Sequence, residues 1–241
     1  MLFISPPFGN YIDTKNTISI KGSYTLYPRP GKILQIIKTL RYSQELNGWT
    51  NCIGLRNPGI DYAIKDWLKQ LNDVSNNNIN KTIYSIAILN DNEIPKLLQK
   101  IPVKMNIELN VSCPNVKNKL IVTGIEQFLN PSRKWCIIKI SPTEDLNRID
   151  QYYKKGFRQF HCSNTLKVQQ GGLSGPMLKP YTNDLIRHIR KTYPDATIIA
   201  GGGIQTVNDI SNYKLEGANH FSISSVFFNP FKALKLFWDL N

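Results

Sequence analysis

The sequence predicts one α/β domain over residues 1–241, folded as a closed barrel of eight parallel strands with intervening helices. Short runs rich in β-branched residues alternate with segments of helical periodicity, which is the pattern of a parallel sheet built from βα units. The length of 241 residues suits one such barrel, since barrels of about 250 residues are common. Polar and glycine-rich motifs follow the strands directly, and enzymes of this fold keep their chemistry at the carboxyl ends of the strands.

The strand pattern occurs eight times, at residues 2–5, 18–21, 82–89, 105–111, 135–140, 158–163, 197–200 and 220–224. The strongest helical pattern lies at 60–71, where Ile60, Ile64 and Trp67 recur on one face. Weaker helical patterns follow at residues 92–100, 121–129, 143–155, 181–193, 207–215 and 230–240. The stretch 9–17 is too short and polar for a helix. The expected fold is therefore a (β/α)8 TIM barrel whose first helix is reduced or missing.

The chain is strongly basic, with a net charge of +13 from 30 Lys and Arg residues against 17 Asp and Glu residues. A nucleic-acid partner is one interpretation of this charge. The lysines are scattered, however, without a basic block or an interleaved row of aromatic residues. The favoured interpretation is a compositional bias combined with the binding of small anions, such as a substrate and a cofactor phosphate.

Composition and spacing argue against a membrane protein and against a metal site. Hydrophobic residues make up 41% of the chain, and no apolar run approaches the roughly 18 residues needed to span a bilayer. The N-terminus has no basic region and runs at once into two prolines, which predicts no signal peptide and a cytoplasmic protein. The cysteines and the three histidines lack the spacing of a disulfide framework or a zinc site.

The most distinctive segment is Glu-Leu-Asn-Val-Ser-Cys-Pro-Asn at residues 108–115. It leaves a buried-strand pattern and delivers two carboxamides (Asn110, Asn115), the hydroxyl of Ser112 and the thiol of Cys113 to the end of a strand. A strand with a polar exit and a half-buried cysteine is the simpler interpretation of a lone cysteine. The order of residues favours a catalytic segment instead.

Four asparagines stand at predicted strand ends in separate parts of the chain: Asn51, Asn110, Asn115 and Asn164. Because an asparagine side chain both donates and accepts hydrogen bonds, this set suits a planar ring that carries an amide edge and a carboxylate. Asn51 also opens the loop Asn-Cys-Ile-Gly-Leu-Arg-Asn-Pro-Gly at residues 51–59, which taken alone is an ordinary Asn/Gly/Pro loop.

Two lysines end apolar strand patterns, Lys21 ahead of Gly22-Ser23 and Lys139 ahead of Ile140. A buried lysine at such a place needs an anionic partner, although each one taken alone is a surface lysine. Glycine-rich turns at residues 171–176 and 200–204, and the pair Ser224-Ser225, follow later strands. Loops after the seventh and eighth strands form the usual phosphate site of such barrels.

Taken in order, these segments resemble the class 1 dihydroorotate dehydrogenases, the soluble members of that family whose base is a cysteine. The resemblance covers nearly the whole chain. It implies that FMN lies across the top of the barrel, held by Ser5, Lys21, Gly22, Ser23, Asn110, Lys139, Gly175, Gly202, Gly203, Ser224 and Ser225. It also implies that dihydroorotate is bound by Lys21, Asn51, Ile53, Gly54, Leu55, Asn110, Asn115, Asn164 and Thr165.

The same resemblance implies a reaction, the oxidation of dihydroorotate to orotate in de novo pyrimidine (UMP) biosynthesis. Cys113 would remove the proton from C5 while a hydride leaves C6 for flavin N5. Lys21 would be the second catalytic residue, because its charge offsets negative charge on the reduced flavin and on the substrate. Fumarate is the expected electron acceptor, since the chain has no cysteine cluster for an iron–sulfur centre. The family also implies a homodimer.

The chain departs from the family pattern in three places. Ser5-Pro6-Pro7 replaces Ala-Ser-Gly at the end of the first strand, and proline cannot donate a backbone N–H to a cofactor. Ser224 replaces a glycine of the phosphate turn, and the segment between Asn164 and Gly171 is short. Because the substrate-facing residues are complete, a trimmed but active enzyme is favoured over a non-catalytic flavoprotein relic.

Two other FMN barrels remain as alternatives. A tRNA-dihydrouridine synthase would give the basic charge a purpose, since contacts to the RNA backbone need Lys and Arg. No appended RNA-binding domain is visible in the sequence, and the asparagine set suits a free small ring better. A dihydropyrimidine dehydrogenase-like barrel is the second alternative.

Overall fold

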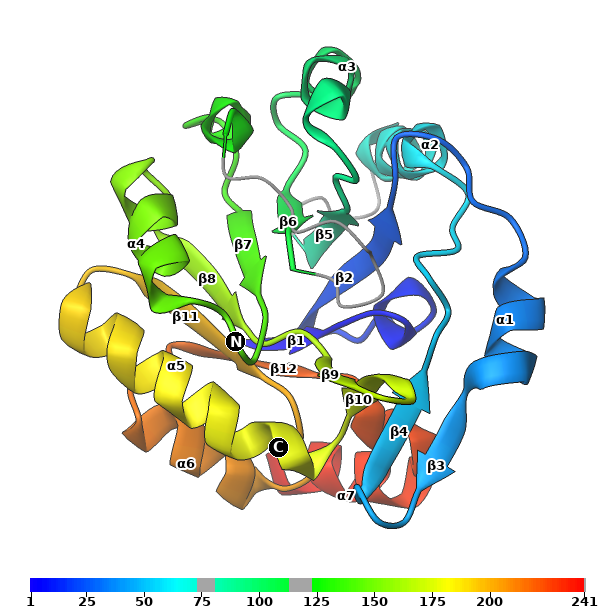
Figure 1. Ribbon diagram of the computed structural model, residues 1–241, viewed down its shortest axis with the longest axis vertical. Helices are drawn as coiled ribbons and strands as arrows, with labels where there is room; N and C mark the ends of the chain where they lie inside the picture. Colours follow the sequence, from blue (N-terminus) through cyan, green and yellow to red (C-terminus); the bar gives the residue numbers. More distant parts are fainter. Residues whose placement is uncertain (73–80, 113–122, 241) are drawn as a thin grey trace.

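The computed structural model describes residues 1–72, 81–112 and 123–240. Eight parallel strands close into a barrel in the order β1-β12-β11-β8-β7-β6-β5-β2 (Figure 1). The strands are β1 (Leu2–Ile4), β2 (Thr17–Tyr24), β5 (Thr82–Ile86), β6 (Ile107–Asn110), β7 (Cys136–Ile140), β8 (Gln159–Cys162), β11 (Thr197–Gly201) and β12 (His220–Ile223). The barrel closes because β1 pairs with both β12 and β2. The eight predicted strands and the barrel are confirmed, with ends that differ by a few residues.

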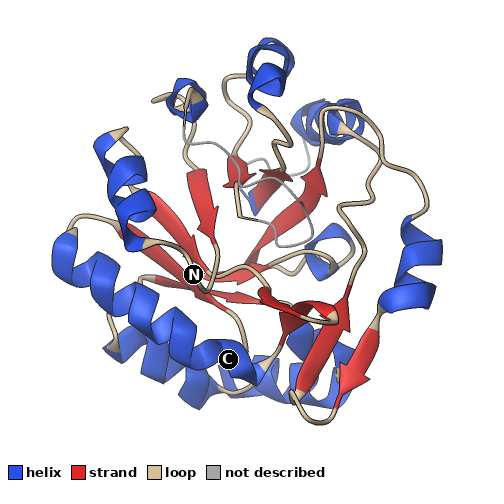
Figure 2. Cartoon of the chain, viewed as in Figure 1, coloured by secondary structure: helices blue, strands red, loops and turns tan. Residues whose placement is uncertain are grey.

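Helices surround the barrel, as Figure 2 shows. They are α1 (Lys32–Thr39), α2 (Ile60–Asn72), α3 (Ile94–Lys100), α4 (Leu146–Lys154), α5 (Lys179–Thr192), α6 (Val207–Leu215) and α7 (Pro230–Leu240). Short 3-10 turns complete the set: η1 (Phe8–Asn10), η3 (Asp91–Glu93), η4 (Ile125–Phe128), η5 (Pro176–Leu178) and η6 (Ser225–Phe228). No helix of the described residues is long and apolar enough to cross a membrane.

The helices agree with the sequence except between β6 and β7 and in the connection that follows β2, where α1 lies. The connection from β1 to β2 holds only η1, so the first helix is reduced to a single 3-10 turn, as expected. Between β6 and β7 the described residues form η4 and not the helix predicted at residues 121–129. Gly124, which precedes that turn, has a left-handed φ of 86°, a backbone conformation that no residue inside an α-helix adopts. Residues 121 and 122 lie outside the described residues.

A second sheet, absent from the sequence prediction, is built from the loops that follow β2 and β8. Its four antiparallel strands have the order β3-β4-β10-β9, with bounds β3 (Arg41–Ser43), β4 (Gly48–Asn51), β9 (Leu166–Val168) and β10 (Gly171–Ser174). The helix α1 lies in the same β2–β4 connection and was also not predicted. The pairing of β4 with β10 joins two loops that are far apart in the sequence, and both leave the carboxyl ends of barrel strands.

The barrel interior changes from apolar to polar along its axis. Its apolar part consists of Phe3, Ile18, Ile20, Ile83, Trp135, Ile137 and Ile199. Side chains two residues apart on a strand face the same side. The residues two positions after Phe3, Ile83 and Ile137 are Ser5, Ser85 and Lys139, so the next layer toward the carboxyl ends is polar. This polar layer forms the base of the candidate site.

Candidate active site

The polar layer centres on Glu108 of β6, which is completely buried. Its carboxylate accepts hydrogen bonds from the Ser85 hydroxyl at 2.7 Å and from His161 Nδ1 at 2.6 Å. Lys139 Nζ lies 3.7 Å from the same carboxylate. Three other strands, β5, β7 and β8, thus supply the partners that a buried carboxylate needs to stay ionised.

The ionisation states in this layer follow from burial and charge. Burial opposes ionisation of Glu108, but the positive charge of Lys139 and the contacts with His161 and Ser85 outweigh it and hold the pKa of Glu108 at about 2. Burial lowers the pKa of His161, against the opposing pull of Glu108. Near neutral pH the layer therefore holds a carboxylate, a neutral imidazole and a lysine that faces that carboxylate.

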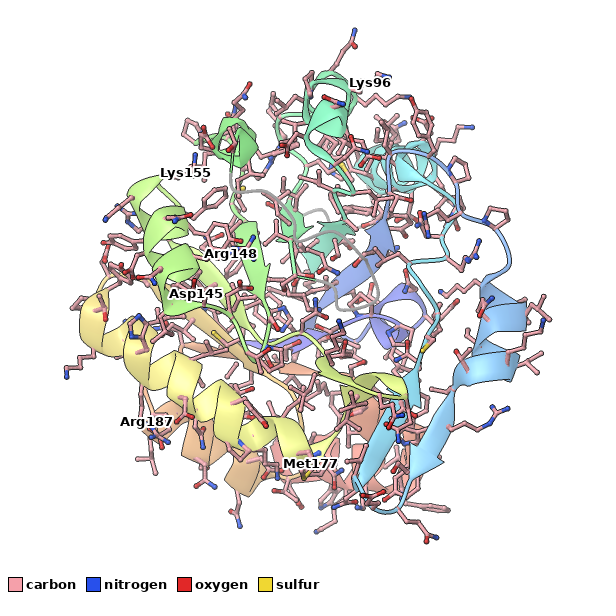
Figure 3. The ribbon with its side chains drawn as sticks, viewed as in Figure 1. Lys96, Asp145, Arg148, Lys155, Met177 and Arg187 are labelled. Carbon is pink, nitrogen blue, oxygen red and sulfur yellow. The ribbon has the colours of Figure 1, made fainter. Side chains whose placement is uncertain are left out.

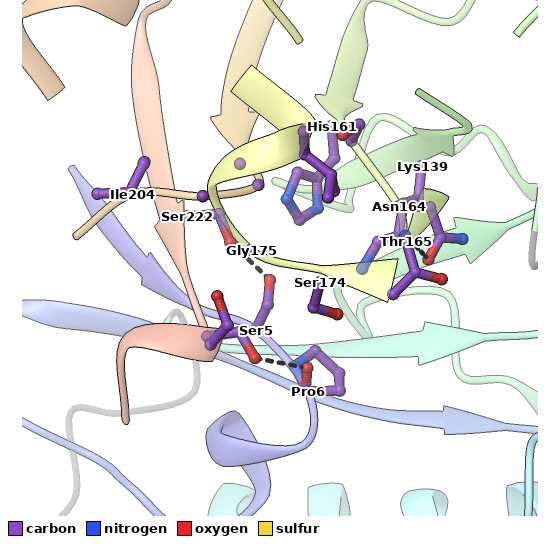
Figure 4. Close-up of a pocket in the computed structure, with 17 residues that line it drawn as sticks. Ser5, Pro6, Lys139, His161, Asn164, Thr165, Ser174, Gly175, Ile204 and Ser222 are labelled. Atoms are coloured by element: carbon purple, nitrogen blue, oxygen red, sulfur yellow. Dashed lines mark hydrogen bonds between the residues drawn. The ribbon is translucent and has the colours of Figure 1, made fainter. Parts of the chain in front are cut away.

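Two adjoining cavities open above this layer. The first, which we call the glycine pocket, has a volume of about 100 Å³ and is lined by Gly175, Gly201, Gly202, Gly203 and Ser225 among others (Figure 4). The second, which we call the ring pocket, has a volume of about 370 Å³ and a mainly apolar wall. Both are lined by Lys139, Asn164, Thr165, Ser174, Ser224 and Ser225. One elongated ligand can therefore occupy both cavities.

The glycine pocket has the features of a phosphate site. Gly202 and Gly203 have φ values of +88° and +80°, which L side chains rarely adopt. A Cβ at Gly203 would lie 2.8 Å from the Gly175 carbonyl oxygen, so a side chain would also fill the cradle. Within the described part of the chain, no acceptor takes the backbone N–H of Gly202 or Gly203. Free amides in a glycine turn ahead of a helix suit a bound anion.

The two serines at the departures from the family pattern are both engaged. Ser5 Oγ lies 2.6 Å from Ser222 Oγ, and Ser224 donates to the Pro6 carbonyl oxygen at 2.9 Å (Figure 4). The Pro6 carbonyl has thereby acquired a partner from the neighbouring strand end. The Ser224 hydroxyl is thus engaged by Pro6, although Ser224 still lines the glycine pocket.

Carboxamides and hydroxyls line the polar wall of the ring pocket. Asn164 Nδ2 donates to Asn110 Oδ1 at 2.8 Å, and Asn110 Nδ2 donates to Ser23 Oγ at 2.9 Å. Ser112 Oγ donates to the Lys139 carbonyl oxygen at 2.9 Å. The strand ends of β2, β6 and β7 are therefore tied together at the wall that a polar ring would meet.

The loop from Asn51 to Gly59 forms another wall of the ring pocket. Its conformation is held by Asn57, whose Oδ1 accepts from the backbone N–H groups of Thr25 and Gly59 and whose Nδ2 donates to the Leu55 carbonyl. Arg29 donates to the Gly54 carbonyl at 3.2 Å through Nη2. Bonded on both sides, the loop presents its backbone to the pocket without help from a ligand.

The family model described as dihydroorotate dehydrogenase matches residues 9–238. The chain belongs to the dihydroorotate dehydrogenase family. It is 31% identical to the catalytic subunit of dihydroorotate dehydrogenase B (NAD(+)) from Enterococcus faecalis, over 95% of this chain and 80% of that one. The corresponding subunit from Petrotoga mobilis is 30% identical over 80% of this chain and 72% of that one.

The fold agrees with that family. The ligand-free dihydroorotate dehydrogenase from Eimeria tenella superposes with a TM-score of 0.75, covering 92% of this chain and 76% of that one at 18% identity. At that identity the likeness shows the fold alone. The family expected from the sequence is confirmed by the sequence comparisons.

Most residues that the resemblance assigned to the site meet at the two pockets. The ring pocket is lined by Gly22, Ser23, Asn51, Ile53, Gly54, Leu55, Asn110, Lys139, Asn164, Thr165, Ser224 and Ser225. The glycine pocket adds Ser5, Gly175, Gly202 and Gly203. Cys113, which directly follows Ser112 in the chain, and Asn115 lie outside the described residues.

Lys21 is not where the sequence expectation placed it. It follows Ile20, which faces the barrel interior, so its side chain leaves the strand on the outer face. Its amine lies 2.8 Å from Asp66 of α2, and the residue lines neither pocket. Lys139, with its amine inside the barrel, is the lysine that both pockets share.

Sequence reasoning missed several residues of the site. His161 and Glu108 were assigned no role, although a charged or titratable residue within an apolar strand is a signal of a buried polar contact. Trp49 and Phe228, stacked with ring centroids 4.4 Å apart, contribute to the wall of the ring pocket. Lys32, Ile36 and Leu40 reach it from α1 and the residue that follows it, a segment in which no helix was predicted.

Proposed function

We propose that this protein oxidises dihydroorotate to orotate in pyrimidine biosynthesis, with FMN as its flavin. The observation that carries the proposal is the junction of a glycine-lined pocket and a carboxamide-lined pocket over one buried lysine, in a chain of the dihydroorotate dehydrogenase family. A mononucleotide could place its phosphate in the glycine pocket and its planar ring in the ring pocket. A small planar acid could stack on that ring and meet the carboxamides of the ring pocket.

The residues present fit FMN. The free amides of Gly202 and Gly203, with Gly175, Ser224 and Ser225, would hold the phosphate. The polar edge of the ring would meet side chains of the polar wall, namely those of Ser23, Asn110 and Lys139, near Gly22 and Ser5. When bound, the flavin accepts the two electrons that leave the substrate as a hydride.

The substrate would be held by Asn51 and the backbone of Ile53, Gly54 and Leu55 on one side. Asn110, Asn115, Asn164 and Thr165 would hold it on the other. Cys113 is proposed as the base that takes the C5 proton onto Sγ, because it follows Ser112 at the end of β6. A free thiol has a pKa of about 8.5, so the rate should rise with pH as the thiolate forms.

Lys139 is better placed than Lys21 to be the cation that offsets negative charge on the reduced flavin. Its amine lies in the wall shared by both pockets, whereas the amine of Lys21 is engaged by Asp66 outside the barrel. We therefore assign to Lys139 the electrostatic role that the family resemblance implied for Lys21.

Two observations bear on the electron acceptor. The relatives above are named catalytic subunits of NAD(+)-linked enzymes, which favours NAD⁺ reached through a second subunit. The chain itself has no cysteine cluster for an iron–sulfur centre, which favoured fumarate. Both acceptors belong in the first assay, and the homodimer stays a prediction.

RNA modification is the alternative that the charge of +13 keeps open. Basic side chains such as Lys96, Lys155 and Arg187 come from α3, the end of α4 and α5, at separate points of the outer ring (Figure 3). This arrangement supports small anions over a continuous nucleic-acid surface. Reduction of the flavin by NADPH with transfer to uridine in tRNA would favour the alternative.

The proposal is tested by turnover of the purified, FMN-loaded protein. Orotate is followed by its ultraviolet absorbance with dihydroorotate as substrate and with fumarate or NAD⁺ as acceptor. We expect the wild type to form orotate. The rate of orotate formation should be roughly a hundredfold lower, or lower still, in Cys113→Ala, since loss of a general base typically slows a reaction by about 10²–10⁴-fold. Cys52→Ala replaces the exposed cysteine beside Asn51, which is a rival for the base, and should keep the wild-type rate. Equal rates in wild type and Cys113→Ala would remove the cysteine as base, and no orotate with any acceptor would remove the proposal.

A further inference from the structure

Glu108 has no part in the proposed binding of FMN or dihydroorotate, yet the interior of the barrel is arranged around it. The residue is 0% exposed, and three strands supply its partners. Burying a carboxylate is costly even when it is paired, and in some proteins such a group serves to position other groups. The contacts of Glu108 show which groups it positions.

A chain of hydrogen bonds leads from the ring pocket to this carboxylate. Asn164 donates to Asn110 at 2.8 Å, and Asn110 donates to Ser23 at 2.9 Å. Ser23 Oγ lies 2.9 Å from Ser85 Oγ, and Ser85 donates to Glu108 at 2.7 Å. Four links therefore connect a carboxamide at the ring pocket with the centre of the barrel.

The direction of this chain is fixed at its buried end. An ionised carboxylate only accepts hydrogen bonds, so the hydroxyl of Ser85 must donate to Glu108. Ser85 then accepts from Ser23, and Ser23 accepts from Asn110. The Oδ1 of Asn110 is consequently left to accept from Asn164. The two carboxamides are thus oriented by a charge that no ligand touches.

His161 completes the arrangement on the other side. Its Nδ1–H donates to Glu108 at 2.6 Å, which fixes the tautomer of a neutral imidazole and leaves Nε2 without a hydrogen. A Cβ placed on Gly201 would lie 2.9 Å from Nε2, so this atom borders the glycine turn. His161 thereby holds the carboxylate in place from beneath the glycine pocket.

Glu108 also faces the charge of Lys139, with 3.7 Å between carboxylate and amine. In this low-dielectric interior the two charges largely offset each other. A group bound above Lys139 therefore meets a cation whose field is reduced by the carboxylate below it.

We propose that Glu108, held by His161, is a positioning residue with two effects: it orients Asn110 and Asn164 toward the substrate, and it reduces the field of Lys139 at the bound flavin. This inference rests on the proposed function, because it assigns the ligands of both pockets. Glu108 would thereby contribute both to the strength of orotate binding and to the reduction potential of the flavin.

The two effects are separated by two substitutions in the FMN-loaded protein. Glu108→Gln removes the charge and lets the side chain donate, which disturbs the polarity of the chain. Reduced flavin carries more negative charge than oxidised flavin, so loss of the carboxylate should favour the reduced form. We expect the ratio of the affinities for reduced and oxidised flavin to rise roughly tenfold, which is measured as a more positive midpoint potential. Orotate should bind roughly tenfold more weakly, because Asn110 and Asn164 lose the orientation that the carboxylate imposes through Ser85 and Ser23.

Ser85→Ala keeps the charge and breaks the chain. It should weaken orotate binding by several fold, within the range of one lost hydrogen bond, and leave the midpoint potential at the wild-type value. Glu45→Gln is the matched control, because it removes one carboxylate from an exposed position outside both pockets. It should change neither quantity.

A Glu108→Gln protein whose potential and orotate affinity equal those of Glu45→Gln would overturn the inference. If Glu108→Gln does not fold, Ser85→Ala decides, and orotate binding at the wild-type strength would overturn it. Failure of the proposed function looks different, because dihydroorotate would then leave the wild-type flavin oxidised. The potential measured with a chemical reductant would still test the effect of Glu108 on Lys139.

Discussion

Asn164, just beyond β8, donates a hydrogen bond of 2.8 Å to Asn110 at the end of β6, and the two residues are 54 positions apart in the chain. The bond joins two strand ends that are not neighbours in the barrel, since β7 lies between them. The pair therefore spans the polar wall of the ring pocket. A ligand that meets one carboxamide meets a geometry set by both.

This bond predicts a large effect of Asn164→Asp. A carboxylate at position 164 would face the Asn110 oxygen without a hydrogen to donate, and it would repel an anionic substrate. Orotate should bind roughly tenfold more weakly or worse, measured by the change in flavin absorbance on titration. Asn147→Asp, on the exposed side of α4, introduces the same charge away from the pockets and should keep the wild-type affinity. Equal affinities of the two variants would contradict the assigned wall.

The two strand lysines should respond differently to replacement by methionine. Lys139→Met leaves Glu108 buried without its cation, so the affinity for FMN should fall by roughly tenfold or more. Lys21→Met removes a partly exposed ion pair with Asp66 and should cost roughly 1 kcal/mol of unfolding free energy or less. Flavin fluorescence on release and urea unfolding measure the two effects. A greater loss of FMN from Lys21→Met would restore the role expected from the sequence.

The glycine pocket predicts a position-specific effect of one methyl group. In Gly203→Ala the new Cβ would lie 2.8 Å from the Gly175 oxygen, within the cradle, and FMN should bind roughly tenfold more weakly. Gly31→Ala is the control, because Gly31 has a similar φ of +90° but nothing within 4 Å of the new atom. Both should lose about 1 kcal/mol of stability through backbone strain, and Gly203→Ala should lose more, because its Cβ also meets backbone atoms of Gly175 and Pro176. If Gly31→Ala lost FMN equally, strain and not the filled cradle would explain the effect.

Stability should decline on acidification in two windows. Because the folded pKa of Glu108 is about 2 against an ordinary 4.5, its contribution is complete above about pH 4.5 and is lost as the pH falls toward 2. His161 has a pKa lowered from 6.5, so the unfolded chain takes up a proton first and stability also falls below that pH. Urea unfolding as a function of pH measures both. Glu108→Gln should flatten the lower window, whereas Glu45→Gln should retain the wild-type profile; an unchanged lower window in Glu108→Gln would contradict the assignment.

The sequence predicted the barrel because each of its strands is a compact apolar run followed by a polar turn. It did not predict the second sheet, whose strands have three or four residues and pair across long sequence distances, as Thr50 does with Leu173. Helix α1 escaped prediction for a related reason. It has only eight residues, none of them buried, and it directly follows the proline- and glycine-containing turn that ends at Gly31.

The sequence did not show which of the two strand lysines points into the barrel. Strands buried on both faces are apolar throughout, so the sequence does not tell which side chain points inward. Lys21 and Lys139 consequently had the same appearance, and only the register with Ile20 and Ile137 separates them. The partnership of Glu108 with His161 was hidden for the same reason, since it depends on which residues of β6 and β8 face the barrel axis.

The most direct test is an anaerobic titration of the purified, FMN-loaded protein with dihydroorotate, followed by the visible flavin spectrum. We predict that the flavin bands bleach with about one equivalent of dihydroorotate per flavin and that orotate is recovered in equal amount, because one two-electron transfer reduces one flavin. A flavin that stays oxidised at a large excess of dihydroorotate would contradict the proposed function. Failure of the chain to bind FMN would contradict the assignment of the glycine pocket as well.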